Sequence, residues 1–249
     1  MINNGSRDDD NATDVDQAEE VLTGPFPREP SDPSVLKSFK AHIAKRNPLR
    51  CYNHSSKILE WWWWSRTNNR RFRDIMQQSG LPSLVHCTYR FVNRIFISAF
   101  VERWKPETNN LHLTVSEMAM TLDDVGNILG IPITGRSVSA ATLIDQQAHA
   151  LVVASVGVDD AKTIEELSST RGQSVKLKWL QSKFSGYKDS DTEESIACAA
   201  KAYLLFLLRY TLFSDKSGTG VPVVYLQLLM DLTDIHTYAW GVAALAYLY

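Results

Sequence analysis

A chain of 249 residues, of which 44% are hydrophobic and 22% charged, has an ordinary globular composition and is long enough to bury a core in one large or two small domains. The net charge of −2 conceals an uneven distribution, because residues 1–33 carry −7, residues 34–105 carry +11 and residues 106–249 carry −6. The chain has three widely spaced cysteines, which argues against a disulfide-rich protein. Its first residues lack a signal-peptide pattern, which argues against a secreted protein. Its longest apolar run (196–208) is too short to cross a bilayer, which argues against a membrane protein.

The first segment of the chain is predicted to be a disordered acidic tail. Residues 1–33 hold nine acidic side chains and few large apolar ones, so nothing in them offsets the entropy lost on ordering. Ordered structure is expected to begin near Val35, with a short basic amphipathic segment to about Lys45. The remaining residues, 34–249, are predicted to form one helical domain.

Four consecutive tryptophans, residues 61–64, lie in a predicted helix that begins near Ser56. Successive side chains of a helix point about 100° apart, so the four rings cannot share one face. We expect two or three to be buried and at least one to lie near the surface. An exposed ring beside the arginines that follow would stack on a base or on the ring of a partner. The alternative, in which all four rings pack against neighbouring helices and expose their edges, is the stronger one from sequence alone, because tryptophan is seldom fully buried.

Helices and a hairpin are predicted in the segment that follows. The helix after the tryptophans stops at Gly80 and Pro82, and the next helix is expected to run from about residue 84 to residue 104. The alternation of apolar and polar residues in 111–115 predicts a strand, and residues 117–122 can pair with it as a small β-hairpin.

A capped helix is predicted directly after the hairpin. Thr121 is its expected N-cap, and Asp123 and Asp124 follow in the first turn, where the helix dipole favours negative charge. Gly130 is expected to close it. The residues predicted for its buried face are Val125, Ile128 and Leu129.

The second half of the chain is predicted to be helical around residues 195–213, an apolar helix that we expect at the centre of the fold. The last helix stops at Tyr249 without a cap, so the domain is expected to be truncated at its C-terminus. The predicted fold class is therefore mostly α, a bundle-like arrangement of many helices with one small β-hairpin near 111–121. The other elements predicted here are helices at 142–156, about 178–184, 222–232 and 234–249, and a short helix or loop at 159–169.

The sequence patterns point to no catalytic, metal or cofactor site. Lys216 lies in a polar loop between helices, without the phosphate cradle and the acidic partner that a pyridoxal phosphate lysine needs. His86 and Cys87 are adjacent, so their side chains do not converge on a metal ion, and His112 stands alone on its strand. The chain also shows neither the glycines of a nucleophile elbow nor a mixed sheet that would carry three carboxylates. We therefore expect a protein that is not an enzyme.

Three blocks of sequence carry a family resemblance. They are residues 101–108 (VERWKPET) with 117–118, 121–125, 129–132 and 135–136; residues 177–180 (LKWL) with Phe184; and residues 203–205, 212–213, 215–218 (DKSG), 238–241 (YAWG) and 245–249. In this order the blocks resemble the plant mobile domain family, also called aminotransferase-like, over roughly residues 55–249. Asn109 and Ser116 depart from the pattern, since the family usually has a histidine and a glycine at these places.

The resemblance implies a plant nuclear protein or the product of a transposable element. The domain occurs in proteins tied to meristem maintenance, genome integrity and the silencing of transposable elements, and some members are fused to a serine/threonine phosphatase domain. The word aminotransferase in the family description implies no activity. Members usually continue past the position of Tyr249, in agreement with the expected truncation.

The basic block 34–105 leaves alternatives open. In the first, its arginines neutralise phosphates and the protein is a non-catalytic module that binds nucleic acid or chromatin. In the second, the same residues anchor a protein partner, such as a phosphatase or a silencing factor. A third is an element-derived product without a host function. Arginines that share one face without acidic partners favour the first, and their dispersal into salt bridges favours the second. The candidate binding residues are Trp61, Trp64, Arg66, Arg70, Arg71, Arg73, Arg90 and Arg94.

Overall fold

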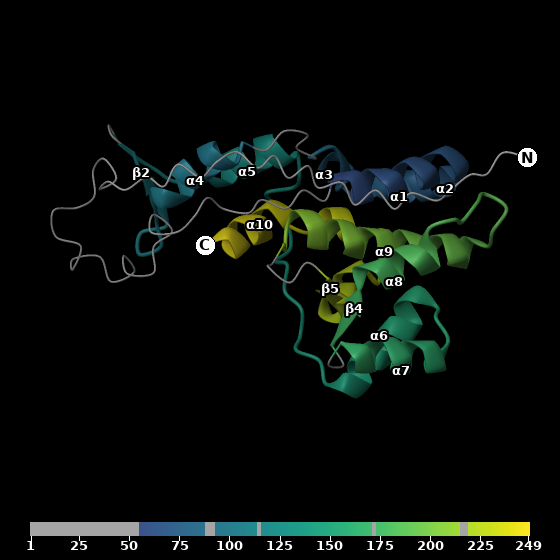
Figure 1. Cartoon of the computed structure of the whole chain (residues 1–249). Helices are drawn as coiled ribbons and strands as arrows, with labels where there is room; N and C mark the ends of the chain where they lie inside the picture. The colour runs from purple at the N-terminus through teal and green to yellow at the C-terminus, as the bar shows by residue number, and fades with distance from the viewer. Residues whose placement is uncertain (1–54, 88–92, 114–115, 171–172, 215–218) are drawn as a thin grey trace, which may run out of the picture. The chain divides into compact units, whose positions relative to one another are not determined.

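The computed structural model of the chain describes residues 55–87, 93–113, 116–170, 173–214 and 219–249, all within the unit Arg46–Tyr249 (Figure 1). The predicted acidic tail, 1–33, and the basic segment near Val35 to Lys45 lie outside the described residues. The described part is mostly helical, as predicted. None of its helices combines the length and the apolar character that a bilayer-spanning helix needs.

Helix α9 (Glu193–Thr211) is the centre of the fold. Thr192 caps it by accepting a hydrogen bond from the Ser195 N–H at 3.2 Å, and Glu193 and Glu194 occupy its first turn, so its start is encoded locally. Nearly every residue from Ala199 to Arg209 is buried. It packs beside α2 (Arg70–Gln78) and α8 (Leu177–Phe184), which confirms the predicted central role (Figure 1).

The N-terminal part of the fold consists of α1 (Ser55–Asn68), α2, α3 (Ser83–His86) and α4 (Arg94–Glu102). The prediction of one helix over 84–104 is wrong, because Cys87 and Asn93 are not helical. Tertiary contacts end α3 early. The Ser83 hydroxyl donates to the Gly130 carbonyl at 2.8 Å, and the Cys87 thiol lies 3.9 Å from the carbonyl oxygens of Ile128 and Leu129.

The predicted hairpin is present and is larger than expected. Strands β1 (Trp104–Lys105), β2 (Asn110–His112) and β3 (Glu117–Met118) form an antiparallel sheet in the order β1-β2-β3, with Leu111 opposite Met118. Hairpin pairing of β2 and β3 was predicted, but β1 was not, because two residues leave no readable alternation.

Helix α5 (Leu122–Leu129) follows the sheet with the predicted N-cap at Thr121, which is part of a capping box with Asp124. Thr121 accepts from the Asp124 N–H at 3.1 Å, the Asp124 carboxylate accepts from the Thr121 N–H at 2.9 Å, and Gly130 closes the helix with φ of +61°. Val125 is buried as predicted, whereas Ile128 is 57% exposed and that prediction is wrong. Gly126 instead sits against Ile133, so only a narrow side of α5 is covered.

A second ladder joins segments that are far apart in the sequence. After α6 (Asp145–Val156) and α7 (Asp160–Ser169), strand β4 (Ser174–Lys176) pairs antiparallel with β5 (Gly220–Pro222), with Val175 opposite Val221. Both valines are buried, at 1% and 0% exposure. Sequence analysis missed this ladder because each strand is three residues long and its partner is not local.

The chain after β5 is less regular than predicted. The expected helix 222–232 is a 3₁₀-helix, η4 (Val223–Leu229), and the expected helix 234–249 is a short 3₁₀-helix, η5 (Ile235–Thr237), followed by α10 (Trp240–Leu248). Trp240 is fully buried, and its indole N–H donates to the Ile235 carbonyl at 2.9 Å. This bond ties α10 to η5, and the non-helical backbone of Tyr238 and Ala239 between them interrupts the helix.

Candidate nucleic-acid interface

One buried stripe runs along α1 and α2. Its residues recur every three or four positions, which places them on one side of both helices: Ile58, Trp61, Trp62, Ser65, Asn69, Phe72 and Met76. Trp61 is 1% exposed, and its ring contacts Tyr203 and Phe206 of α9 edge-on, at 5.2 and 5.0 Å between ring centroids. The prediction that Trp61 contacts a ligand at the surface is therefore wrong.

Among the three tryptophans of the run whose side chains are described, Trp63 is the exposed one, with 55% of its surface accessible. This agrees with the expectation of two or three buried rings and at least one near the surface, since Trp61 and Trp62 are buried. The Arg66 guanidinium carbon lies 4.8 Å from the Trp63 ring centroid, a cation–π contact. Sequence analysis named Trp61 and Trp64 as binding residues and did not name Trp63. The buried stripe could have identified it, because position 63 lies opposite that stripe.

Arg66, Arg70 and Arg73 follow Trp63 at intervals of three and four residues. We call Trp63 and these three arginines the exposed stripe. Arg66 and Arg70 are exposed and Arg73 is half-buried. Arg71 is also exposed but falls on another side of the helix. The structure thus places Arg66 on α1 and Arg70 and Arg73 on α2.

The junction of α1 and α2 holds the stripe in place. The Asn69 side chain accepts a hydrogen bond from the Phe72 N–H at 2.8 Å and caps α2. The Asp189 carboxylate accepts from the backbone N–H groups of Arg70 and Arg71, at 2.7 and 3.5 Å. This carboxylate therefore neutralises the N-terminal end of α2.

The guanidinium groups of the stripe have no carboxylate partner in the part of the chain that the structure describes. The ion pairs found there join His112 to Glu117, Arg136 to Asp234 and His149 to Asp160. This pattern is the one expected for phosphate binding and differs from dispersal into salt bridges.

Three candidate residues have no described side chain. Arg90 lies outside the described residues, and Trp64 and Arg94 belong to α1 and α4 without a described side-chain placement. Their role in binding stays a prediction.

The motif blocks at residues 129–136 and 238–241 meet in a second cluster, the motif junction. The Arg136 N–H donates to the Thr237 carbonyl at 2.8 Å, and the Ala239 N–H donates to the Arg136 carbonyl at 2.9 Å. The Gly241 N–H donates to the Pro132 carbonyl at 2.8 Å. These backbone bonds hold α5 and α10 together, so the motif residues serve packing.

Glycine is required at this junction. A Cβ on Gly135 would lie 2.2 Å from the Thr237 carbonyl oxygen, and a Cβ on Gly241 would lie 2.7 Å from the Ile133 side chain. Arg136 also makes side-chain contacts at the surface of this junction. Its guanidinium pairs with Asp234 at 3.0 Å and lies 4.8 Å from the Tyr238 ring centroid.

The half-buried thiols at Cys87 and Cys198 are not activated. Burial raises the pKa of both, which lowers the fraction of reactive thiolate at neutral pH. Among the described residues, no three His, Cys, Asp or Glu side chains gather in a way that could hold a metal ion.

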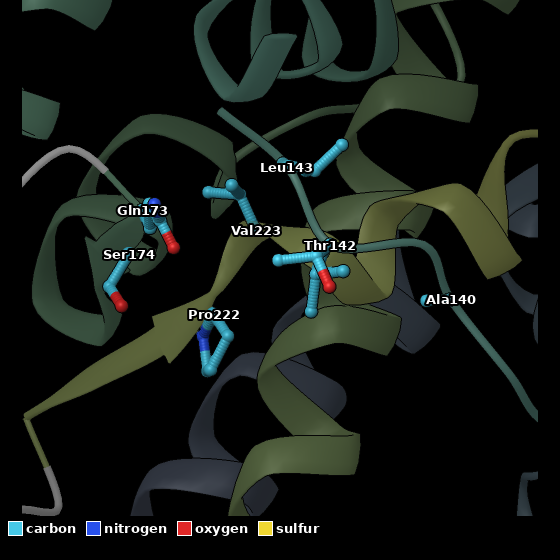
Figure 2. A pocket seen from close by; sticks show the side chains of 8 residues that line it. Ala140, Thr142, Leu143, Gln173, Ser174, Pro222 and Val223 are labelled. Carbon is cyan, nitrogen blue, oxygen red and sulfur yellow. The ribbon is translucent and has the colours of Figure 1, made fainter. Parts of the chain in front are cut away.

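A pocket of about 390 Å³ opens where the segment 140–143 passes the start of β4 and the end of β5 (Figure 2). In Figure 2, Gln173 and Ser174 lie on one side of it and Thr142 and Leu143 on the other. Gln227 fixes the segment, since its side-chain amide exchanges two hydrogen bonds with the Ala141 backbone, at 2.8 and 3.2 Å. The eight described lining residues carry no titratable side chain, so they offer polar and apolar contacts without acid–base chemistry.

Comparison with known proteins identifies relatives of this chain. The family model described as Plant mobile domain matches residues 80–249. Protein MAIN-LIKE 2 of Arabidopsis thaliana is 37% identical over 237 residues, which cover 92% of this chain and 33% of that protein. Protein MAINTENANCE OF MERISTEMS of the same plant is 35% identical over 205 residues, covering 82% of this chain and 41% of that protein.

A third Arabidopsis thaliana relative is the serine/threonine-protein phosphatase 7 long form homolog. It is 30% identical over 177 residues, or 68% of this chain and 12% of that protein. This chain thus spans well under half the length of these curated relatives. No solved structure matches it.

Proposed function

The chain belongs to the plant mobile domain family, and from this premise we propose that it is a non-catalytic nuclear protein that binds nucleic acid or chromatin through the arginines of α1 and α2. Its relative named for the maintenance of meristems supports a role in meristem maintenance. The family resemblance further points to genome integrity and the silencing of transposable elements.

The observation that carries the proposal is the arrangement of Arg66, Arg70, Arg71 and Arg73. They lie on two consecutive helices, and three of them are exposed. Their guanidinium groups are unpaired with carboxylates among the described residues. Clustered arginines of this kind neutralise phosphates of any sequence and release counterions.

The non-catalytic part of the proposal rests on the motif junction. The residues that define the family blocks there, Gly135, Arg136 and Gly241, are engaged in backbone pairing, a solvent-exposed ion pair and close packing. Groups used in this way are positioned to hold elements together.

Binding of the full chain to labelled double- and single-stranded DNA and RNA across a salt series tests the proposal. Four neutralised phosphates give a slope of log K against log salt of about −3.6 for duplex DNA and about −2.8 for single strands. The variant Arg66/Arg70/Arg71/Arg73→Ala should lose most of this binding and flatten the slope.

A matched control removes the same charge elsewhere. Lys162, Lys176, Lys178 and Lys183 are exposed on α7, β4 and α8, so their joint replacement by alanine should leave binding nearly unchanged. Equal loss in both quadruple variants would contradict a specific site on α1 and α2. Absence of binding by the unaltered chain at low salt would overturn the proposal altogether.

A protein-binding role is the second candidate, and the phosphatase relative favours it. The shared domain makes up only a small part of that protein, so the domain there accompanies a much longer chain. Exposed tryptophan and arginine are frequent anchors of protein interfaces, and Trp63 with Arg66 supplies both. Retention of a protein partner by the unaltered chain and its loss in the arginine variant, with no nucleic-acid binding, would support this role instead.

A further inference from the structure

We propose that the exposed stripe of Trp63, Arg66, Arg70 and Arg73 binds single-stranded nucleic acid, with the Trp63 ring stacked on an unpaired base. This inference rests on the nucleic-acid binding proposed above. It adds the strandedness of the ligand and a binding residue, Trp63, that no motif singles out.

The Trp63 ring is placed as a stacking platform. It is 55% exposed, while its neighbours Trp61 and Trp62 are 1% and 4% exposed and anchor α1 in the core. Arg66 covers the ring at 4.8 Å from its centroid. In the described part of the chain no other aromatic ring contacts Trp63. The Trp63 ring is therefore contacted by the Arg66 guanidinium and keeps exposed surface on which a base can stack.

The arginines continue from this ring along the helices. Trp63 and Arg66 lie about one turn apart on α1, and Arg70 and Arg73 lie about one turn apart on α2, with the extended residue Asn69 between the two helices. A strand that places one base on Trp63 would therefore bring its neighbouring phosphates to Arg66, Arg70 and Arg73 in succession.

Stacking on Trp63 selects single strands over duplexes. In a duplex each base stacks on its neighbours and shows only its edges in the grooves, so a protein ring reaches a base face only after the base is unstacked. A single strand offers base faces without that cost. Stacking is also tolerant of sequence, because every base has a π-face, so we expect little base preference.

Fluorescence anisotropy with the full chain tests this inference. The probes are a labelled oligothymidine of about 12 nucleotides, an abasic strand of the same length and a duplex of the same length. The unaltered chain should bind oligothymidine most tightly. Three neutralised phosphates give a salt slope of about −2 for the single strand.

Substitutions at Trp63 separate stacking from charge. Trp63→Ala should weaken oligothymidine binding about 5- to 100-fold and leave abasic binding unchanged, since only a base can stack. Trp63→Phe keeps an aromatic face and should restore most of the affinity. Because the ring is exposed, thermal unfolding of both variants should match that of the unaltered chain, which confirms that the fold is intact.

The outcomes separate the two proposals. Duplex binding as tight as single-strand binding, with Trp63→Ala without effect, would overturn the single-strand inference and leave nucleic-acid binding standing. Failure of all three probes to bind at low salt, or binding that Arg66/Arg70/Arg73→Ala does not change, would overturn both.

Discussion

Gly135→Ala is expected to destabilise the protein strongly, because the motif junction has no room for a side chain at this position. Gly135 has φ of +134°, which L side chains rarely adopt, and an added Cβ would lie 2.2 Å from the Thr237 carbonyl oxygen and 3.3 Å from the Ala239 nitrogen. To remove this clash, the segment of Gly135 and Arg136 must move away from residues 237–239. That movement breaks the hydrogen bonds between Arg136 and residues 237 and 239, at 2.8 and 2.9 Å. With about 1 kcal/mol for each hydrogen bond and about 1–3 kcal/mol for backbone strain, the unfolding free energy should fall by about 3–5 kcal/mol.

Thermal unfolding followed by circular dichroism measures this effect. For a folded unit of this size, 1 kcal/mol lowers the midpoint by about 2–4 °C, so the expected drop is about 6–20 °C. Gly220→Ala is the matched control, since its φ lies outside the left-handed region and the nearest atom to its added Cβ is the Val175 carbonyl oxygen at 3.5 Å. It should shift the midpoint by a few degrees at most. Equal midpoints for the two variants would refute the reasoning that Gly135 is held against η5 by tight backbone pairing.

Three further predictions concern stability. Trp61→Ala removes a fully buried ring and should lower the unfolding free energy by about 3–5 kcal/mol in urea denaturation. Trp63→Ala, close by on the same helix, should change it by less than about 0.5 kcal/mol. Similar losses in the two variants would contradict the assignment of Trp61 to the buried face of α1 and of Trp63 to the exposed face. Arg209→Met leaves two carbonyls without their buried donor and should cost about 2–4 kcal/mol in the same assay, and a loss near zero would mean that the bonds are not needed. The capping bonds from Thr121 hold the pKa of Asp124 below its ordinary value, so the stability they contribute is present above the pKa of the unfolded carboxyl and is lost as pH falls through the folded pKa. Thr121→Ala should therefore flatten the acid side of the stability profile, and an unchanged profile would argue against the capping box.

Sequence patterns predicted local features well where neighbouring residues determine them. The N-cap at Thr121, the acidic first turn after it and the glycine stop at Gly130 all depend on contacts within one turn, and all are present. The cap of α9 at Thr192 is equally local but was not predicted, because the helix was expected to begin near residue 195. The β2–β3 hairpin is local in the same sense. The β4–β5 ladder was not predictable, because its partners are separated by α8 and α9.

The sequence predicted that the candidate site is basic, but it predicted only some of the residues that form it. The basic block and the tryptophan run are visible in the sequence, and the stripe at Arg66, Arg70 and Arg73 lies within it. Which tryptophan is exposed depends on where α9 packs against α1. Trp61 was chosen at the sequence level and is buried, while Trp63 was passed over and is exposed.

The sequence by itself determined the helical class, the caps and the apolar helix around which the rest assembles. These follow from hydrophobic spacing and from side chains that bond to their own turn. Tertiary structure alone decided the rotation of α1, the break at Cys87 and the pairing of the motif blocks through Gly135 and Gly241. The physical reason is that neighbouring elements decide which side of a helix is exposed and where the helix ends. Those neighbouring elements come from residues that are remote in the chain.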